Sequence, residues 1–203
     1  MDFEFLARRR PLEALTWSAY MDLLAAEAEA APPAGDPEAA QRYEYTKLNL
    51  HRSRRIERSW LPSDELATLL QTITEPEQWV VLTEPWCGDS AQCLPCVAVM
   101  AERQTNIDLH MLLRDKNPDI MDQFLTGGKR SIPVVAMFDP AGRLVGRWGP
   151  RPAAAQAVFD TAERSGAAKP EILEHLHLWY GKDRGKALDA EFCALLRRRI
   201  GGA

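Results

Sequence analysis

The residue best suited to chemistry in this chain is Cys87, within the segment Pro85-Trp86-Cys87-Gly88-Asp89-Ser90. An apolar run over residues 79–83 leads into the segment, and a helix is expected from Ala91 to Arg103. At such a junction, free backbone N–H groups and the positive end of the helix dipole lower the pKa of a thiol. Ser90 can donate a hydrogen bond to the thiolate from the next turn. We therefore expect a redox or thiol-transfer site with Cys87 and Ser90 as catalytic residues; the alternative is a relic cysteine in a fold used only for binding.

The other three cysteines are interpreted as packing residues. Cys93 lies more than one helical turn beyond Cys87, about 9 Å along the axis and on another face, so a disulfide between them would require the helix to unwind. Cys93 and Cys96 are therefore expected to be small buried side chains, as is Cys193 on the apolar face of the last helix.

The chain has no set of side chains with the spacing of a metal site. His175 and His177 are two positions apart and point to different faces of a helix. No cofactor is expected, although glutathione or another small thiol could serve as a co-substrate. Asp89 is interpreted as a favourable acidic residue in the first turn of the helix, although its charge would oppose thiolate formation at Cys87. Basic residues that could hold the carboxylates of a small thiol are Arg114, Lys129, Arg130 and Arg151.

The elements that would position Cys87 alternate between strands and helices. Apolar runs predict buried strands over residues 79–83, 107–113 and 132–138, and a turn at 139–142 predicts an antiparallel return over 144–148. Helices are expected after Ser63, over 91–103, from 117 to the Gly127-Gly128 pair, and over 153–164. Two strands joined through a helix lie parallel, so helices should cover both faces of the sheet.

Helical segments flank this core. Residues 3–30 are expected to be helical, with Pro11 as a start or a break, and a second helix is expected from Pro37 to about Arg58. The apolar face of the second helix would carry Tyr45, Leu48 and Ile56. Residues 169–199 are expected to be helical as well. The predicted division is an N-terminal helical arm over 1–59, a core domain over 60–167 and a C-terminal helical extension over 168–203.

Composition restricts the class of protein. The chain is 46% apolar and 27% charged with a net charge of −4, which is typical of a soluble globular protein and gives no reason to expect nucleic-acid or membrane binding. No secretory signal pattern or run long enough to cross a bilayer is visible, so a cytoplasmic location is expected. The short basic clusters Arg8–Arg10 and Arg197–Arg199 are interpreted as solvated helix ends.

Several features in register resemble the thioredoxin family over roughly residues 60–167. They are Trp86-Cys87-Gly88, Pro95, Asp115-Lys116-Asn117-Pro118, Ile132-Pro133 and Gly149. The resemblance implies a thioredoxin-like three-layer α/β/α domain, here with N- and C-terminal helical extensions. It also implies a cis bond before Pro133 and a substrate-binding groove in which Trp86 forms an apolar lip and the backbone of Ile132 pairs with an extended substrate. The longer string Trp-Cys-Gly-Asp-Ser-Ala-Gln is similar to a poorly characterised bacterial thioredoxin-like group.

Two positions depart from the family pattern. Thioredoxins carry Cys-x-x-Cys, but here Ser90 takes the place of the second cysteine. Thioredoxins also have a buried aspartate that assists the second thiol, and here Val81 occupies that position. Without a resolving thiol there is nothing for that aspartate to deprotonate, so the two losses fit together and place the ordinary dithiol cycle in doubt.

These features lead to a first hypothesis of a monothiol oxidoreductase. Cys87 would attack mixed disulfides or sulfenates, and an external thiol would resolve the intermediate. The partners would be protein or low-molecular-weight disulfides, with no nucleic acid and no membrane. The second hypothesis is a non-catalytic binding or adaptor module that uses the groove between Trp86 and Ile132-Pro133. A third is that the helical extensions mediate a homodimer.

Overall fold

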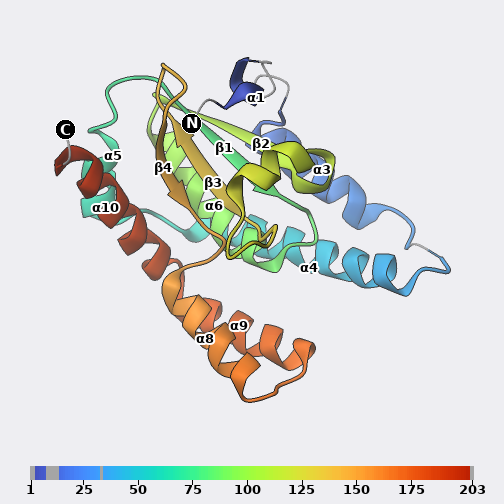
Figure 1. Cartoon of the computed structure of the whole chain (residues 1–203). Coiled ribbons are helices and arrows are strands. Elements are labelled where there is room, and N and C mark those ends of the chain that lie inside the picture. Colours follow the sequence, from blue (N-terminus) through green and yellow to red (C-terminus); the bar gives the residue numbers. More distant parts are fainter. Residues whose placement is uncertain (1–2, 8–13, 33, 202–203) are drawn as a thin grey trace.

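A computed structural model describes residues 3–7, 14–32 and 34–201 of the chain, built around a four-stranded sheet (Figure 1). The strands are β1 (Glu77–Thr83), β2 (Ile107–Leu113), β3 (Val134–Phe138) and β4 (Leu144–Trp148). Their order is β2-β1-β3-β4; β1 and β2 are parallel, and β3 is antiparallel to both of its neighbours. Helix α6 (Gly88–Arg103) joins the parallel pair, as a parallel connection requires.

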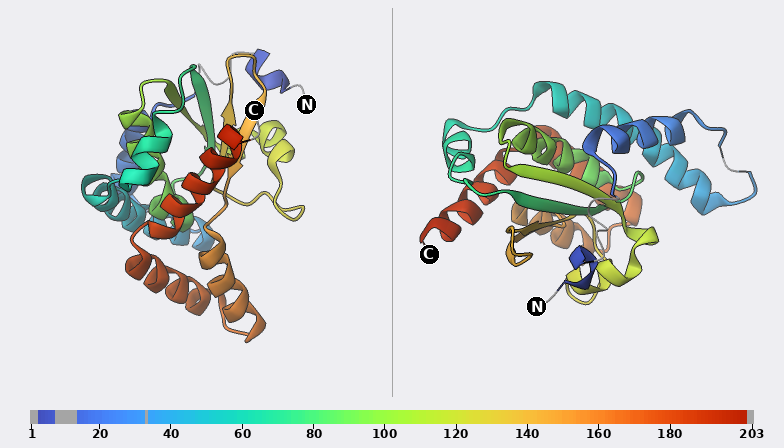
Figure 2. Two further views of the ribbon diagram at one scale, coloured as in Figure 1. Left: turned by 90° about the vertical axis from the view of Figure 1, so that its left-hand side faces the viewer. Right: turned by 90° about the horizontal axis from the view of Figure 1, so that it is seen from above.

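Alternate residues of the strands enter two separate hydrophobic clusters, one on each face of the sheet. On one face, Trp79 and Val81 pack with residues of α6, of α3 (Trp17–Glu29), of α5 (Asp64–Leu70) and of α10 (Lys186–Gly201). On the other face, Val80 and Leu82 pack with Ile120 of α7 (Pro118–Met121) and with the N-terminal segment that contains α1 (Glu4–Ala7). The period of two along β1 therefore builds the expected three-layer α/β/α arrangement, visible from above in Figure 2.

The N-terminal segment differs from the expected long helix. Only Glu4–Ala7 and Trp17–Glu29 are described as helical within 3–30, and Pro11 lies outside the described residues. Between the two helices, Leu15 exchanges backbone hydrogen bonds with Met111 of β2, at N–O distances of 3.0 and 2.8 Å. Leu15 is therefore extended beside the edge strand β2 instead of helical. The free backbone N–H and C=O groups of an edge strand favour such pairing, which competes with helix formation.

Helix α4 (Pro37–Ser59) is confirmed in extent, but its buried face is different from the one expected. Leu48 is 46% exposed and Tyr45 is only half-buried, whereas Ile56 packs against the main hydrophobic cluster as expected. The residues that α4 buries are mostly polar: Thr46, Asn49, Leu50 and Ser53. Small and polar side chains allow α4 to lie close to α6, so most of its buried face contacts the neighbouring helix, while Ile56 contacts the apolar core.

Two further boundaries differ from expectation. Strand β3 begins at Val134 instead of residue 132. The helix after Asn117 is short: α7 ends at Met121, and a 3₁₀ turn, η2 (Asp122–Phe124), follows. Gly127 and Gly128 adopt the expected positive φ of 56° and 76°, but they close a separate turn between Thr126 and Lys129.

The C-terminal part of the chain consists of three helices. Helices α8 (Ala153–Arg164) and α9 (Lys169–Asp183) lie side by side at one end of the molecule, and α10 returns along the sheet (Figures 1 and 2). Arg184, with a φ of 57°, and Gly185, with a φ of 81°, separate α9 from α10. Residues 169–199 are therefore helical as expected, but they form two helices rather than one.

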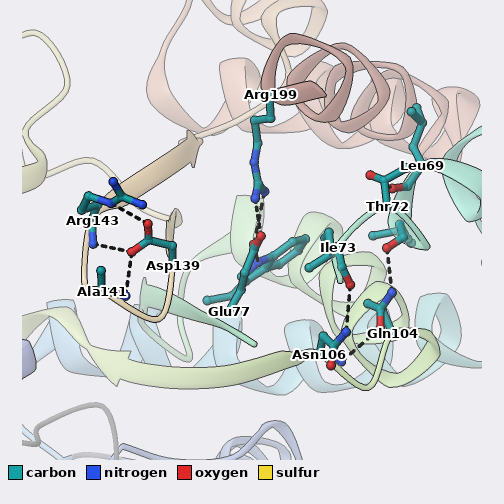
Figure 3. Close-up of polar contacts among 12 residues, drawn as sticks. Leu69, Thr72, Ile73, Glu77, Gln104, Asn106, Asp139, Ala141, Arg143 and Arg199 are labelled. Carbon is teal, nitrogen blue, oxygen red and sulfur yellow. Dashed lines mark hydrogen bonds and ion pairs between the residues drawn. The ribbon is translucent and has the colours of Figure 1, made fainter. Parts of the chain in front are cut away.

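Polar contacts fasten the end of β1 that lies away from Cys87 (Figure 3). The carboxylate of Glu77 accepts hydrogen bonds from the indole of Trp79, at 2.9 Å, and from Arg199. Nearby, Asn106 Nδ2 donates to the carbonyl oxygen of Ile73 at 2.9 Å. The interpretation of Arg199 as a solvated helix end is therefore wrong, because this side chain ties α10 to the first strand.

Among the described residues, no helix combines the length and the apolar composition that crossing a bilayer would need. The same part of the chain contains no cluster of three or more His, Cys, Asp or Glu side chains arranged to hold a metal ion.

Candidate functional site

Cys87 lies between β1 and α6 and is the N-cap residue of the helix. Its sulfur accepts a hydrogen bond from the backbone N–H of Ser90 at 3.5 Å, and its S–H donates to the carbonyl oxygen of Ile132 at 3.5 Å. The Ile132–Pro133 peptide bond is cis. Cys87, Ser90, Ile132 and Pro133 are therefore brought together at the same end of the sheet, although Ile132 and Pro133 are buried rather than open to solvent.

The expected lowering of the Cys87 pKa is wrong for this conformation. The residue is only 7% exposed. Burial, followed by the nearby negative charge of Asp89, raises the pKa of the Cys87 thiol to about 11, although hydrogen bonds from Ser90 and Asp89 oppose the increase. At neutral pH the thiol is therefore protonated and donates to Ile132. A reactive thiolate requires the sulfur to be opened to solvent or to a substrate.

A chain of buried hydroxyl groups ends at this sulfur. The hydroxyl of Thr83, at the end of β1, donates to Ser90 Oγ at 2.8 Å, and the hydroxyl oxygen of Tyr20 of α3 lies 3.5 Å from Thr83 Oγ1. Because Thr83 gives its hydrogen to Ser90, Tyr20 is the donor in the first contact, and its burial raises its pKa so that it keeps its proton. The Ser90 hydroxyl is then left to donate to Cys87, where it lowers the thiol pKa. All three hydroxyls thus support negative charge on the sulfur.

Removing the Thr83 hydroxyl, the middle group of this chain, should weaken the stabilisation of the Cys87 thiolate. In Thr83→Val, Ser90 loses its buried donor, and alkylation of Cys87 by iodoacetamide at fixed alkaline pH should slow about two- to tenfold, the effect of one hydrogen bond of roughly 0.5–1.5 kcal/mol. Thr83→Ser keeps the hydroxyl and should react at the wild-type rate. Equal rates in all three proteins would show that the hydroxyl chain does not act on the sulfur.

Asp89 does more than begin a helix favourably. It is 8% exposed, forms an ion pair with Arg151 at 2.6 Å and accepts a hydrogen bond from the Tyr180 hydroxyl at 2.6 Å. Tyr180 belongs to α9, and Arg151 precedes α8. Two residues from the C-terminal part of the chain therefore bind the carboxylate of Asp89, two positions after Cys87. The sequence did not indicate these contacts.

The basic residues proposed to hold small-thiol carboxylates include three that already have partners. Arg151 pairs with Asp89, Arg130 pairs with Asp122 at 2.7 Å, and Arg114 pairs with Asp115 at 2.8 Å. Arg114 also lies 4.9 Å from the centre of the Trp86 ring, as Arg42 of α4 does at 5.0 Å. Trp86 is half-buried beside these two guanidinium groups, so the expected apolar lip is flanked by positive charge.

His177 is a neighbour of the site that sequence reasoning missed. A Cβ atom added to Gly88 would lie 2.8 Å from His177 Cε1, which shows how closely the imidazole of α9 covers the residue after Cys87. Burial, together with the positive charge of Arg52, lowers the pKa of His177 to about 4. Its Nδ1 atom has no hydrogen-bond partner in the described part of the chain. His175, in contrast, is exposed, so the expectation that the two histidines face different directions is confirmed.

The low pKa of His177 gives a testable pH dependence. The unfolded chain takes up this proton near pH 6.5 and the folded chain only near pH 4, so the free energy of unfolding should fall as pH decreases from 6.5 to 4. Urea denaturation of His177→Gln should show a shallower decrease over this range. His175→Gln, which changes an exposed neighbour, should keep the wild-type dependence; identical pH profiles for all three proteins would contradict the assignment.

A family model described as thioredoxin matches residues 37–164. The chain belongs to the thioredoxin family. The match begins at the start of α4, so this helix lies inside the family region, whereas α3, α9 and α10 lie outside it. The division into an arm over 1–59, a core domain over 60–167 and an extension over 168–203 stays a prediction.

Two solved structures share the thioredoxin-like fold with this family member. A protein of unknown function from Pseudomonas aeruginosa is 22% identical, with a TM-score of 0.58, and the alignment covers 93% of this chain and 99% of that one. An HIV epitope scaffold is 25% identical, with a TM-score of 0.53 and the same coverage. No protein with a curated description matches the chain. Both alignments extend over nearly the whole chain and therefore into the helical extensions.

Two contacts hold the loops of the thioredoxin-like site in place. Asn49 of α4 donates from Nδ2 to the carbonyl oxygen of Pro85 at 2.9 Å. Gly149, with a φ of 117°, packs its backbone against Pro133, where an added Cβ would lie 2.1 Å from the carbonyl oxygen. Gly149 was among the features that carried the resemblance, but Asn49 lies in a helix whose sequence pattern pointed to other residues as its buried face.

Proposed function

We propose that Cys87 carries out monothiol exchange with protein or low-molecular-weight disulfides. The observation that supports it best is the arrangement of donors around one sulfur: the Ser90 N–H at 3.5 Å and the hydroxyl chain from Tyr20 through Thr83 to Ser90. These groups stabilise a thiolate or a leaving thiolate at Cys87. Cys93 and Cys96 are buried further along α6, and all four cysteines are free, which favours a single reacting thiol.

The proposed cycle has two exchanges. The Cys87 thiolate attacks one sulfur of a disulfide R–S–S–R′, so that the bond between Cys87 and R–S forms while R′–S⁻ leaves and takes up a proton. A small external thiol such as glutathione then attacks the mixed disulfide, releasing Cys87 and forming a disulfide with R–S. With a sulfenate in its protonated form, R–SOH, the first step yields the same mixed disulfide, and the leaving hydroxide takes up a proton from solvent to form water. The external thiol supplies the electrons, so no bound cofactor is required.

Substrate binding would also activate the sulfur. In the resting structure the S–H group donates to Ile132, a contact that disfavours a thiolate because a carbonyl oxygen repels negative charge. An extended substrate that pairs with the backbone of Ile132 beside Pro133 and contacts Trp86 would take over this carbonyl and leave the Ser90 donors on the sulfur. The pKa of about 11 then describes the protein without substrate.

The burial of Cys87 favours a second candidate, a binding or adaptor module. The protonated thiol of a residue that is only 7% exposed is a poor nucleophile, and the same groove could hold a peptide without any chemistry. In that case Trp86, with Arg42 and Arg114 near its ring, would contact the partner.

Intact-mass measurement after incubation with oxidised glutathione separates the two functions. We expect a single adduct on Cys87 in the wild type, none in Cys87→Ser, and an unchanged adduct in Cys193→Ser. Turnover of a glutathionylated peptide with glutathione as reductant should fall to the uncatalysed rate in Cys87→Ser. If turnover is no faster than that of Cys87→Ser, or if adducts form only on other cysteines, the monothiol function is wrong and the binding module is favoured.

A further inference from the structure

A cavity of about 770 Å³ lies between α4, α6, α9 and the beginning of α10, and Cys87 does not line it. Its size is within the range of about 300–1,000 Å³ that is usual for small-molecule sites. Ile56, Trp60 and Cys96 contribute apolar surface. Cys96 is fully buried and burial raises its thiol pKa, so it forms part of the wall rather than a reactive group.

Two polar groups in this wall have no partner within the described part of the chain. The Gln92 side chain is only 8% exposed, yet neither its amide nitrogen nor its oxygen makes a hydrogen bond there. The indole N–H of Trp60, a residue that is 8% exposed, is likewise without an acceptor among the described residues. Both side chains line the cavity, where a molecule with hydrogen-bonding atoms can reach them.

The rim of the cavity carries an excess of positive charge. Arg55, Arg184 and Lys186 line it, are exposed, and form no ion pair with any described residue. The acidic residue at the rim, Asp189, already accepts hydrogen bonds from Ser63 N and Oγ at 2.8 and 2.7 Å. The unpaired guanidinium and ammonium groups therefore favour an anion.

We propose that this cavity binds an organic anion with an apolar ring. Its carboxylate or phosphate oxygens would lie among Arg55, Arg184 and Lys186, and its ring would pack against Trp60 and Ile56. A polar atom of the ligand would pair with Gln92. This site is separate from the thiol chemistry of Cys87.

Titration with 8-anilinonaphthalene-1-sulfonate, followed by fluorescence, tests the site. We expect saturable binding of one molecule per chain. Competition uses one ring with three head groups: 1-naphthoate and 1-naphthyl phosphate should displace the probe, and neutral 1-naphthalenemethanol should do so at least tenfold less well. The ratio of the first two distinguishes a carboxylate from a phosphate ligand.

Variants assign the binding to this cavity. A Cβ on Gly181 of α9 would meet nothing within 4 Å, so Gly181→Leu should fill the space without a clash and weaken probe binding at least tenfold. Arg55→Ser combined with Arg184→Ser changes only exposed rim residues and should weaken it to a similar degree. Gln92→Met, which keeps the volume but removes the amide, should weaken binding about three- to tenfold while leaving thermal stability equal or higher.

Matched controls make the result decisive. Arg54→Ser and Lys182→Ser each remove a positive charge beside the cavity without changing its lining, and both should bind as the wild type does. Cys87→Ser should also bind normally, so a failure of the monothiol function leaves this test intact. The proposal is overturned if no saturable binding occurs, if the neutral competitor equals the anions, or if the double arginine variant binds with wild-type affinity.

Discussion

Gly149→Ala is expected to destabilise the protein by roughly 3–5 kcal/mol, a large fraction of the roughly 5–15 kcal/mol by which ordinary domains are stable. The added Cβ would lie 2.1 Å from the carbonyl oxygen of Pro133 and 3.3 Å from the Cα of Val134, both parts of the backbone that cannot rotate away. A φ of 117° adds further strain for any residue with a side chain. Urea denaturation measures the loss.

Gly166→Ala is the matched control for this result. Gly166 also has a positive φ, 77°, but a Cβ there would meet nothing within 4 Å. Gly166→Ala should lower the free energy of unfolding by about 1–2 kcal/mol, which is the effect of a left-handed backbone conformation alone. If both variants lose the same amount, the close approach to Pro133 contributes nothing. If Gly149→Ala stays folded, Cys87 should be alkylated faster than in wild type, because a displaced Ile132 carbonyl no longer holds the S–H group.

Arg151→Met should cost about 3 kcal/mol or more, because it leaves the Asp89 carboxylate buried without its cation. The Arg151 and Asp89 side chains are 15% and 9% exposed and are 2.6 Å apart. Methionine retains much of the packing against Phe159, whose ring centre lies 4.5 Å from the guanidinium carbon, so the loss reports the charge. Chemical denaturation at pH 7 is the measurement.

A second substitution separates the ion pair from packing. Asp89→Asn combined with Arg151→Met removes both charges and should recover a large part of the lost stability, because the new amide oxygen could still accept the hydrogen bond from Tyr180. Arg143→Met breaks a pair with Asp139 in which the arginine is 80% exposed, and it should change stability little. The absence of recovery in the double variant would show that Arg151 acts through packing.

Asp89→Asn alone addresses the reactivity of the sulfur. The negative charge of Asp89 is the second cause, after burial, of the raised Cys87 pKa. The apparent pKa from the pH dependence of Cys87 alkylation should therefore be lower than about 11 in this variant. A pKa equal to or above that of wild type would mean that the Asp89 charge has no influence on the thiol.

Much of the fold follows from local patterns. The apolar runs of β1 and β2, the Ser63 N-cap and the turn before β4 each depend on residues close together in the chain, so their positions were confirmed within a few residues. The segment near Leu15 was missed because its partner is Met111, on the edge of the sheet. The buried face of α4 was missed because close helix contact favoured small and polar residues over the apolar ones that periodicity singles out.

The sequence alone determined where the candidate site lies and that it holds one thiol. A cysteine between an apolar strand and a helix, with serine at the fourth position of the motif, is a local pattern. Only the tertiary structure decided the state of that thiol. Its acceptor, Ile132, is 45 residues away in the chain, and the partners of Asp89 are 62 and 91 residues away. Burial and charge act through space, and no spacing of residues along the chain specifies which distant groups will surround a sulfur.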